Sequence, residues 1–393
     1  MNKVKFWLVS FLLFGISNLY SQGTVITSSF YSSSLNQNRS FEIYLPQGYE
    51  DDSDVFYPVV YFLHGFGAYG SYTWGVEDIL NDGISTGELL PMIVVLPDGG
   101  SVEYEGSFYT NSEFNGPFKD YIVQDLVTFI DENYRTYLHP HYRAVSGHSM
   151  GGYGTMKLAM LHPEIFSSLA AHSGPIAFEL LDNPLLINFF LIENFGQEFS
   201  PNNGSLSQML FAMSAAFSPN MENPPWYVDM PLDNSGDIIS EVFDRWMDHD
   251  PFTLLDSYAE SLSDQNIYID CGSYDELQLA PHSEAFSERL NELGIEHIYE
   301  SYSGNHSNMV AERMEISFQF HSDHFADPPA EECTAGDVNV DGMINVIDVV
   351  NLVNIVLDTE QPTDEELCAG DMNGDGLLNV LDIILVVNII LES

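Results

Sequence analysis

The sequence predicts two parts, a large α/β domain with a mostly parallel sheet and a small, duplicated all-α module. Short β-rich runs alternate with helical segments from about residue 24 to residue 325, as in a parallel sheet covered by helices. A serine stands at a glycine-flanked turn in the middle of that region. Beyond it, a short segment repeats once.

Composition excludes several classes of partner. The 393 residues are 45% hydrophobic, enough for a full core and a second domain. Ten Lys and Arg against 59 Asp and Glu give a formal net charge of -49, which repels nucleic acid and anionic lipid. We interpret the acidity as a general solubility feature, in saline surroundings or around bound cations, rather than as a site.

The first 21 residues have the form of a secretory signal peptide. Lys3 and Lys5 precede an apolar run over 6–16, and a polar stretch follows. The run is too short to span a bilayer, which takes about 20 apolar residues, and no later run reaches that length. We therefore expect a secreted or cell-surface protein without a membrane span.

The large domain is expected over 24–326. Its strand candidates are 41–45, 59–63, 92–96, 168–172, 266–270 and 296–302, and its helix candidates are 121–134, the segment from the serine turn to Pro163, and 282–293. The runs 59–63 and 92–96 are continuously apolar, which is typical of strands covered on both faces.

The segment 176–249 breaks this rhythm. It is rich in Phe, Met, Leu and Pro and shows no strand alternation. We interpret it as a lid-like insertion over the C-terminal edge of the sheet, where α/β enzymes place their sites. The alternative is that it packs on the flank of the domain.

The serine turn has the form of a nucleophile elbow. Gly147, Ser149 and Gly151 fill the pattern G-x-S-x-G, in which a strained turn exposes the serine and the glycines let strand and helix approach. A catalytic serine needs a base and an acid that orients the base. His306 follows the last predicted strand and is the candidate base, and Asp275 is the candidate acid, with Asp270 as runner-up.

An oxyanion hole is expected beside the elbow. His64-Gly65-Phe66-Gly67 follows the strand candidate 59–63 and has the form H-G-x-G. The backbone amides of Phe66 and Met150 are the candidate donors, each typically worth about 3 kcal/mol of transition-state stabilisation. The alternative for this loop is a tight glycine turn without a ligand.

From about Phe41 to His306 the chain resembles the esterase D-like branch of the α/β hydrolases, which includes feruloyl esterases and other carbohydrate esterase family 1 enzymes, acetylxylan esterases and S-formylglutathione hydrolases. The resemblance rests on the motifs YLPQGY at 44–49, YFLHG at 61–65, VVLPD at 94–98, GHSMGG at 147–152 and Asp250-Pro251. It implies an α/β-hydrolase fold and ester hydrolysis through an acyl-serine, without a cofactor. The long 176–249 segment departs from the family, and an export signal disfavours a cytosolic thioester substrate.

Aromatic residues near these loops could hold an aryl acyl group by stacking, or could belong to the core. The candidates for substrate contact are Trp74, Tyr153, Trp226 and Tyr227. Export together with the C-terminal module favours feruloyl, acetyl or related esters of plant or algal polysaccharides. The alternatives are an acyltransferase on the same triad, as in mycolyltransferases, a polyester or general short-chain esterase, and a catalytically dead binding protein.

A linker is expected at 327–332, followed by a calcium-binding module over 333–393. Two loops match at a period of 371 − 337 = 34 residues and supply oxygens in the order that Ca²⁺ coordination needs. The expected ligands of two structural Ca²⁺ ions are Asp337, Asn339, Asp341, the Met343 carbonyl and Asp348 in the first loop, and Asp371, Asn373, Asp375, the Leu377 carbonyl and Asp382 in the second.

This module resembles the dockerin type I domain over 337–391, because aspartate ends each loop and no helix enters the first loop. The resemblance implies a cohesin-like or cell-surface partner. Apolar helices are expected over 346–357 and 380–391. Cys333 and Cys368 precede the two loops, and they either pair or remain free thiols.

Overall fold

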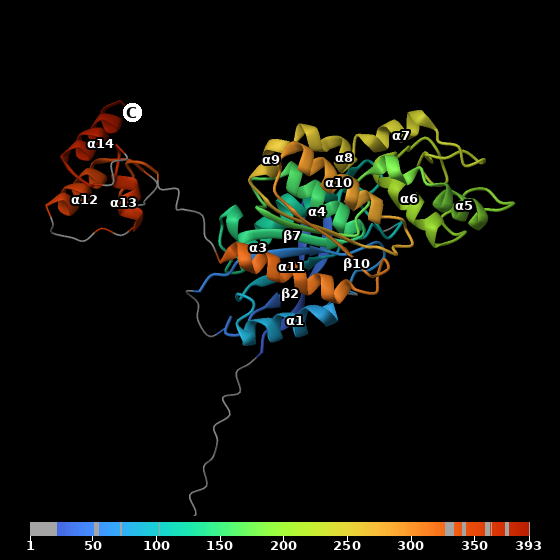
Figure 1. Ribbon diagram of the computed structural model, residues 1–393, viewed down its shortest axis with the longest axis horizontal. Helices are drawn as coiled ribbons and strands as arrows, with labels where there is room; N and C mark the ends of the chain where they lie inside the picture. The colour runs from blue at the N-terminus through green and yellow to red at the C-terminus, as the bar shows by residue number, and fades with distance from the viewer. Residues whose placement is uncertain are drawn as a thin grey trace, which may run out of the picture. The chain divides into compact units, whose positions relative to one another are not determined.

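The computed structural model describes residues 22–50, 55–70, 73–101, 103–326, 334–339, 343–357, 362, 364–373 and 377–392. The chain divides into two compact units between Ala326 and Asp327 (Figure 1). The predicted signal peptide and the predicted linker lie outside the described residues. Within the described part of the chain, no helix combines the length and apolarity that a bilayer crossing requires.

An eight-stranded mixed sheet forms the centre of the larger unit, in the order β1-β2-β4-β3-β7-β8-β9-β10. The strands are β1 (Thr24–Ser32), β2 (Gln37–Leu45), β3 (Val59–Leu63), β4 (Ile93–Pro97), β7 (Arg143–His148), β8 (Ser168–His172), β9 (Asn266–Gly272) and β10 (Ile298–Tyr302). β1 and β2 pair antiparallel, as do β2 and β4, and all later pairs are parallel. The loops that leave β3, β7, β9 and β10 therefore meet at one edge.

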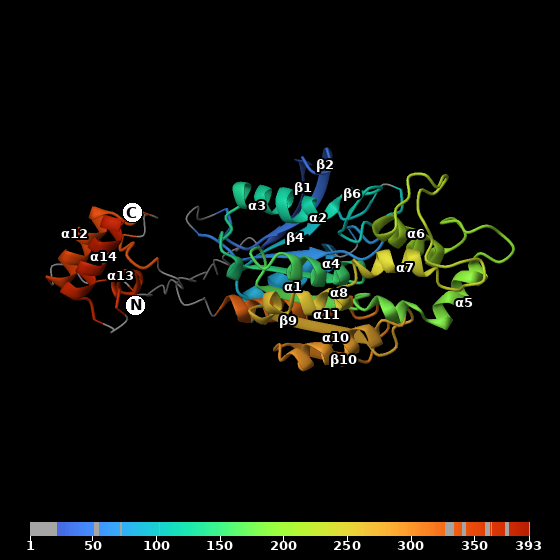
Figure 2. The same cartoon turned by 90° about the horizontal axis from the view of Figure 1, so that it is seen from above.

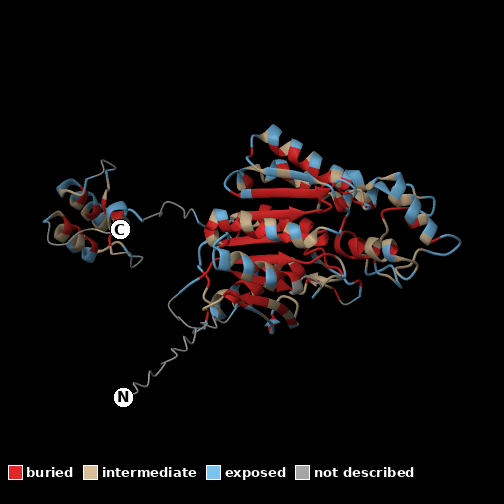
Figure 3. Cartoon of the chain, turned by 60° about the horizontal axis from the view of Figure 1, so that its bottom comes forward, coloured by how far each residue is buried: buried red, intermediate tan, exposed pale blue. Residues whose placement is uncertain are grey.

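Helices cover both faces of this sheet, because its central strands are apolar on both sides. β3 shows the division: Val59, Tyr61 and Leu63 join one core cluster, and Val60 and Phe62 join the other. The first face is covered by α2 (Phe118–Asp120), the π-helical turn η1 (Tyr121–Leu126), α3 (Val127–Asn133), α4 (Met150–Leu161) and α10 (Ala280–Leu293), and the second by α1 (Thr73–Thr86) and α11 (Val310–Phe325). Figure 3 shows the central strands buried and the helices buried on one side, whereas the edge strands β1 and β10 have few or no buried residues.

The segment 176–249 is helical, and none of its described residues forms a named strand. It contains η3 (Phe178–Leu181), α5 (Pro184–Glu193), α6 (Ser205–Phe217) and α7 (Ser240–Met247). Figures 1 and 2 show α5, α6 and α7 gathered at one end of the larger unit. The chain then returns to β9 through α8 (Pro251–Leu254), η4 (Leu255–Ser257) and α9 (Ala259–Ser263).

A short hairpin lies in the long loop after β4. Its strands are β5 (Asn111–Ser112) and β6 (Gly116–Pro117), which pair antiparallel. The Ser112 hydroxyl donates a hydrogen bond to the carbonyl of Ala215 on α6, which ties this loop to the insertion.

The smaller unit packs α12 (Val346–Val356) against α14 (Val380–Glu392), with α13 (Asp364–Gly370) between them in sequence. Its described core is small, because only Val338, Leu352, Ile355 and Val386 are buried in its apolar cluster. The two helices begin and end within one residue of the ranges that the sequence predicts.

Candidate active site

Ser149 stands at the sharp turn between β7 and α4. Its backbone has φ 60° and ψ -117°, a conformation that a residue with a Cβ rarely adopts. The close approach of β7 and α4 requires glycine on both sides of Ser149. A Cβ on Gly147 would lie 2.6 Å from the Gly151 carbonyl carbon, and a Cβ on Gly151 would lie 1.9 Å from the Leu63 carbonyl oxygen. The Ser149 N–H donates to the His172 carbonyl at 2.9 Å.

The structure brings Ser149, His306 and Asp275 into one hydrogen-bonded chain. His306 Nε2 lies 2.9 Å from Ser149 Oγ, and His306 Nδ1 lies 2.7 Å from Asp275 Oδ2. All three residues are buried. A carboxylate can only accept, so the Nδ1–H donates to Asp275 and Nε2 is left to accept the serine proton.

Asp275 is held in its ionised form. Burial alone raises its pKa, but the hydrogen bond and charge of His306 and the Leu277 N–H, 2.8 Å away, together lower the pKa below its ordinary value. Glu276, which the sequence analysis missed, accepts the His306 N–H at 3.0 Å. Nothing in the sequence around Glu276 marks it for this contact.

Two further histidines lie next to this chain. His148 Nε2 donates to the His306 carbonyl at 2.6 Å. Burial, followed by the neighbouring His306, lowers the pKa of His148 to about 3, so it remains neutral. The runner-up acid, Asp270, lies 3.0 Å from His172 Nδ1 and 3.5 Å from Arg313 Nη1 rather than beside His306.

The two predicted oxyanion donors are backbone N–H groups of different loops. Met150 begins α4 and Phe66 follows β3, and within the described residues neither backbone N–H donates to an acceptor in the protein. The first N–H groups of a helix carry partial positive charge. Gly106 packs closely against the side chains of Phe66 and Met150, because a Cβ on Gly106 would lie 2.6 Å from Phe66 Cδ2 and 3.1 Å from Met150 Sδ.

A family model described as "Putative esterase" matches residues 32–310. The chain belongs to this esterase family. A second model, the dockerin type I domain, matches residues 335–391. The esterase therefore carries a C-terminal dockerin domain, a class that generally binds calcium and pairs with cohesins.

Curated relatives match parts of the esterase unit. An esterase of Mycobacterium tuberculosis is 34% identical over 154 residues, which cover 37% of this chain and 31% of that protein. An endo-1,4-beta-xylanase/feruloyl esterase of Xylanibacter ruminicola is 29% identical over 162 residues, covering 39% of this chain and 22% of that protein. The matched stretch thus spans less than a third of either relative.

Solved structures show the same fold. A ferulic acid esterase superimposes with a TM-score of 0.56 at 21% identity, over 77% of this chain and 99% of that chain. An S-formylglutathione hydrolase from Staphylococcus aureus gives 0.54 at 18% identity, over 77% of this chain and 100% of that chain. The predicted α/β-hydrolase fold is confirmed.

The residues predicted to contact substrate do not gather at the triad. Tyr153 is a correction: its side chain is fully buried, stacks on Phe178 and donates to the His249 carbonyl at 2.9 Å, so it offers no face to a substrate. Trp226 and Tyr227 line a cleft that the three triad side chains do not line. The Trp74 side chain lies outside the described residues.

The two predicted calcium loops fold alike. Asp348 is fully buried and accepts the N–H groups of Asn339 and Asn345 at 3.1 and 2.7 Å. Asp382 is also fully buried and accepts the equivalent N–H groups of Asn373 and Asn379 at 3.3 and 2.9 Å. Asp337 is buried at the start of the first loop. Buried carboxylates at matching loop positions fit a cation.

Part of that donor set lies outside the described residues, namely Asp341 and Asp375. Asn339, Met343, Asp371, Asn373 and Leu377 are described. In the described ranges, no group of three or more His, Cys, Asp or Glu converges as a metal site. Cys368 is disulfide-bonded and Cys271 is a buried free thiol, whereas Cys333 lies outside the described residues.

Proposed function

We propose that the esterase hydrolyses carboxylic esters with Ser149 as nucleophile, His306 as general base and then acid, and Asp275 as the residue that orients His306. The observation that carries this proposal is the hydrogen-bonded chain from Ser149 Oγ through both His306 nitrogens to Asp275. Such a chain on three separate loops matches the roles that acyl transfer requires.

In the first half-reaction, Ser149 Oγ attacks the ester carbonyl carbon while His306 Nε2 takes the hydroxyl proton. The Phe66 and Met150 N–H groups donate to the oxyanion of the tetrahedral intermediate. The intermediate collapses, the bond to the alcohol oxygen breaks, and His306 gives its proton to the departing alcohol. In the second half, water attacks the acyl-serine with His306 again as base, which releases the carboxylic acid and restores Ser149.

A burst measurement tests this mechanism. Rapid mixing with p-nitrophenyl acetate should release close to one equivalent of p-nitrophenol before steady turnover, and the trapped acetyl group should map to the Ser149 peptide by mass spectrometry. An acetyl group found on another residue, with Ser149 unmodified, would overturn the assignment.

We propose feruloyl, acetyl or related polysaccharide esters as the substrate class. The feruloyl esterase activity of the Xylanibacter ruminicola relative supports this choice, as does a dockerin domain on an esterase. Turnover of methyl ferulate should exceed that of long-chain p-nitrophenyl esters on the same preparation. Equal or faster hydrolysis of the long-chain esters rules out feruloyl specificity.

For the C-terminal domain we propose two structural Ca²⁺ ions, bound by the two loops, and attachment to a cohesin or a cell-surface protein. The matching burial of Asp348 and Asp382 supports two equivalent sites. We also propose that the chain is exported with residues 1–21 as its signal. A single Ca²⁺ per chain in equilibrium dialysis would reduce the proposal to one site.

A further inference from the structure

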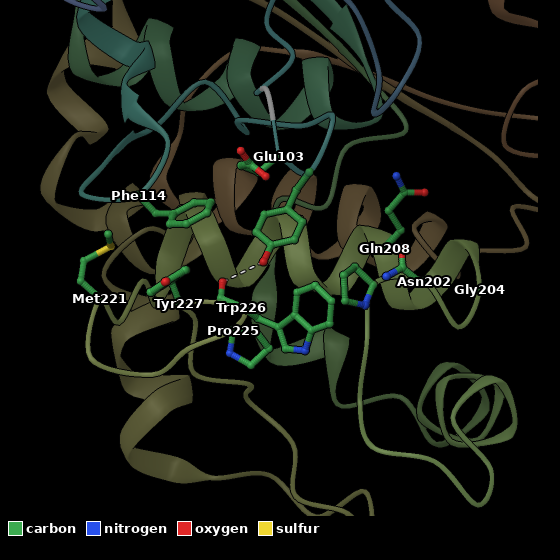
Figure 4. A pocket seen from close by; sticks show the side chains of 11 residues that line it. Glu103, Phe114, Asn202, Gly204, Gln208, Met221, Pro225, Trp226 and Tyr227 are labelled. Atoms are coloured by element: carbon green, nitrogen blue, oxygen red, sulfur yellow. Dashed lines mark hydrogen bonds between the residues drawn. The ribbon is translucent and has the colours of Figure 1, made fainter.

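A cleft opens between the loop after β4 and the insertion (Figure 4). Its volume is about 780 Å³. Aromatic faces and neutral amides dominate its lining. The residues that the argument uses are Glu103, Phe114, Asn202, Gln208, Trp226 and Tyr227.

The aromatic walls of this cleft are fixed by contacts between the two segments. The Tyr104 hydroxyl donates to the Trp226 carbonyl at 2.7 Å, as the dashed line in Figure 4 shows. Phe114 and Tyr227 stack with ring centroids 6.1 Å apart and an interplanar angle of 24°. The Tyr227 backbone has a φ of 56°. A bulky residue adopts this left-handed conformation rarely, and only where the surrounding structure stabilises it.

The polar groups of the cleft are available to a ligand. Within the described residues, the side chains of Glu103, Asn202 and Gln208 have no hydrogen-bond partner in the protein. They present acceptors and amide donors, which suit the hydroxyl groups of a sugar. The lining includes no Lys, Arg or His, so nothing in it would neutralise a phosphate, sulfate or uronate group.

The cleft is connected to the proposed oxyanion hole by a few residues of one loop. Gly106 lies against Phe66 and Met150, and the Gly67 N–H donates to the Glu105 carbonyl at 3.4 Å. Tyr104 is two residues from Gly106, a Cα separation of at most about 7.6 Å. A sugar chain bound in the cleft can therefore extend towards an ester held at Ser149.

We propose that this cleft binds a neutral oligosaccharide, the sugar chain that carries the ester. The negative faces of Trp226 and Tyr227 attract the C–H groups of sugar rings, while Glu103, Asn202 and Gln208 bind hydroxyl groups. The link between this sugar site and catalysis rests on the proposed function. Sugar binding itself does not require ester turnover. It assigns the two aromatic residues to the sugar rather than to the acyl group.

Binding is measured on the full-length Ser149→Ala variant, which cannot turn the ester over. Calorimetric titration with xylohexaose, cellohexaose and mannohexaose should show binding of at least one of them, and Trp226→Ala should weaken it by about ten-fold through loss of the stacked face. Phe195→Ala is the matched control, because Phe195 is 86% exposed on the insertion and does not line the cleft. It should bind like the parent.

No binding of any of the three sugars up to about 10 mM overturns the proposal. Ferulic acid binding that is lost in Trp226→Ala also overturns it, because the cleft would then hold the acyl group. In turnover, Trp226→Ala should lower the ratio of kcat/KM for a feruloylated xylo-oligosaccharide to that for methyl ferulate. If the wild type hydrolysed no ester while the hexaose still bound, only the proposed function would fail.

Discussion

Asp275 and Asp270 are the two residues whose roles the structure separates most clearly. Both carboxylates are buried, but only Asp275 lies within hydrogen-bond distance of His306. Asp270 faces His172 and Arg313. We therefore expect Asp275 to orient the base and Asp270 to stabilise the folded structure around β9.

Replacing each of these carboxylates should give different results. Asp275→Asn should reduce kcat by about 10⁴, because an amide at this position favours the wrong His306 tautomer. Asp270→Asn should instead lower the unfolding free energy by about 3 kcal/mol, because it leaves buried partners uncompensated. Steady-state kinetics and urea unfolding on both variants separate the two effects. A larger kcat loss in Asp270→Asn would assign the acid role to Asp270.

Lys157 should make stability depend on pH. It is buried on α4, and burial, followed by Lys119, lowers its pKa from 10.5 to about 7. Between these values the unfolded chain binds the proton more tightly than the folded chain, so stability rises as pH rises from about 7 towards 10.5. Below pH 7 Lys157 is charged in both the folded and the unfolded chain, and the full cost of burying its charge then lowers the stability of the folded chain.

Lys157→Met isolates this contribution. The variant should be stabilised relative to wild type at pH 6, and the difference in Tm should shrink steadily between pH 7 and 10. Tyr153 keeps its hydrogen bond to the His249 carbonyl in this variant, so the inner end of α4 retains that anchor. A difference in Tm that is the same at all pH values would mean that Lys157 does not titrate in this range.

At the scale of elements, the turn from β7 into α4 fixes where Ser149 points. The start of α4 lies so close to the end of β3 that Gly151 has no room for a side chain beside the Leu63 backbone. α1 offers a contrast, since a Cβ on Gly75 would come no closer than 3.9 Å to Ile79 Cδ1.

Alanine at these two glycines should have opposite effects. Gly151→Ala should destabilise the esterase unit by about 3 kcal/mol and abolish hydrolysis, because backbone must move to admit the methyl group. Gly75→Ala should be neutral or stabilise α1 by about 0.5–1 kcal/mol, because alanine is the better helix former. Wild-type stability and activity in Gly151→Ala would show that the elbow tolerates a wider approach.

Sequence patterns predicted elements best where burial on both faces left only apolar residues. β3 and β8 begin and end at the predicted residues, 59–63 and 168–172. Asp275 and His306, which lie within hydrogen-bond distance of each other, were predicted because chain order limits a triad to few loops. The antiparallel start of the sheet was not predicted, since the polar residues of β1 give no strong alternation. The π-helical turn η1 keeps helical spacing and is invisible in the sequence.

The site was predictable as far as it depends on motifs and not beyond. Tyr153 was expected at the substrate because it is an aromatic residue near the elbow, but its ring lies on the buried face of α4. The Glu276 contact depends on how two loops meet, which no local pattern encodes. The same holds for the cleft between 103–114 and the insertion.

At the scale of the whole molecule, two compact units predict two separable behaviours. The dockerin domain has few buried apolar side chains, so bound calcium should supply much of its folding free energy. The esterase unit has an extensive core on both faces of its sheet, so we expect its stability not to depend on those loops.

Chelation should therefore unfold one unit only. Adding EGTA to the full chain should remove a calorimetric transition and leave kcat/KM for methyl ferulate unchanged. Asp348→Ala should reproduce part of this loss without chelator, because Asp348 is a proposed ligand in the first loop. Loss of hydrolysis on adding EGTA would require a calcium site that supports the esterase unit itself.

The central claim, that Ser149 is the nucleophile of an esterase, is tested most directly by the hydrolysis of p-nitrophenyl acetate by Ser149→Ala. With the oxyanion donors and His306 left in place, the variant should lose on the order of 10⁶ in kcat. Its circular dichroism and Tm should match those of the wild type. Hydrolysis at the wild-type rate by this folded variant would contradict the claim.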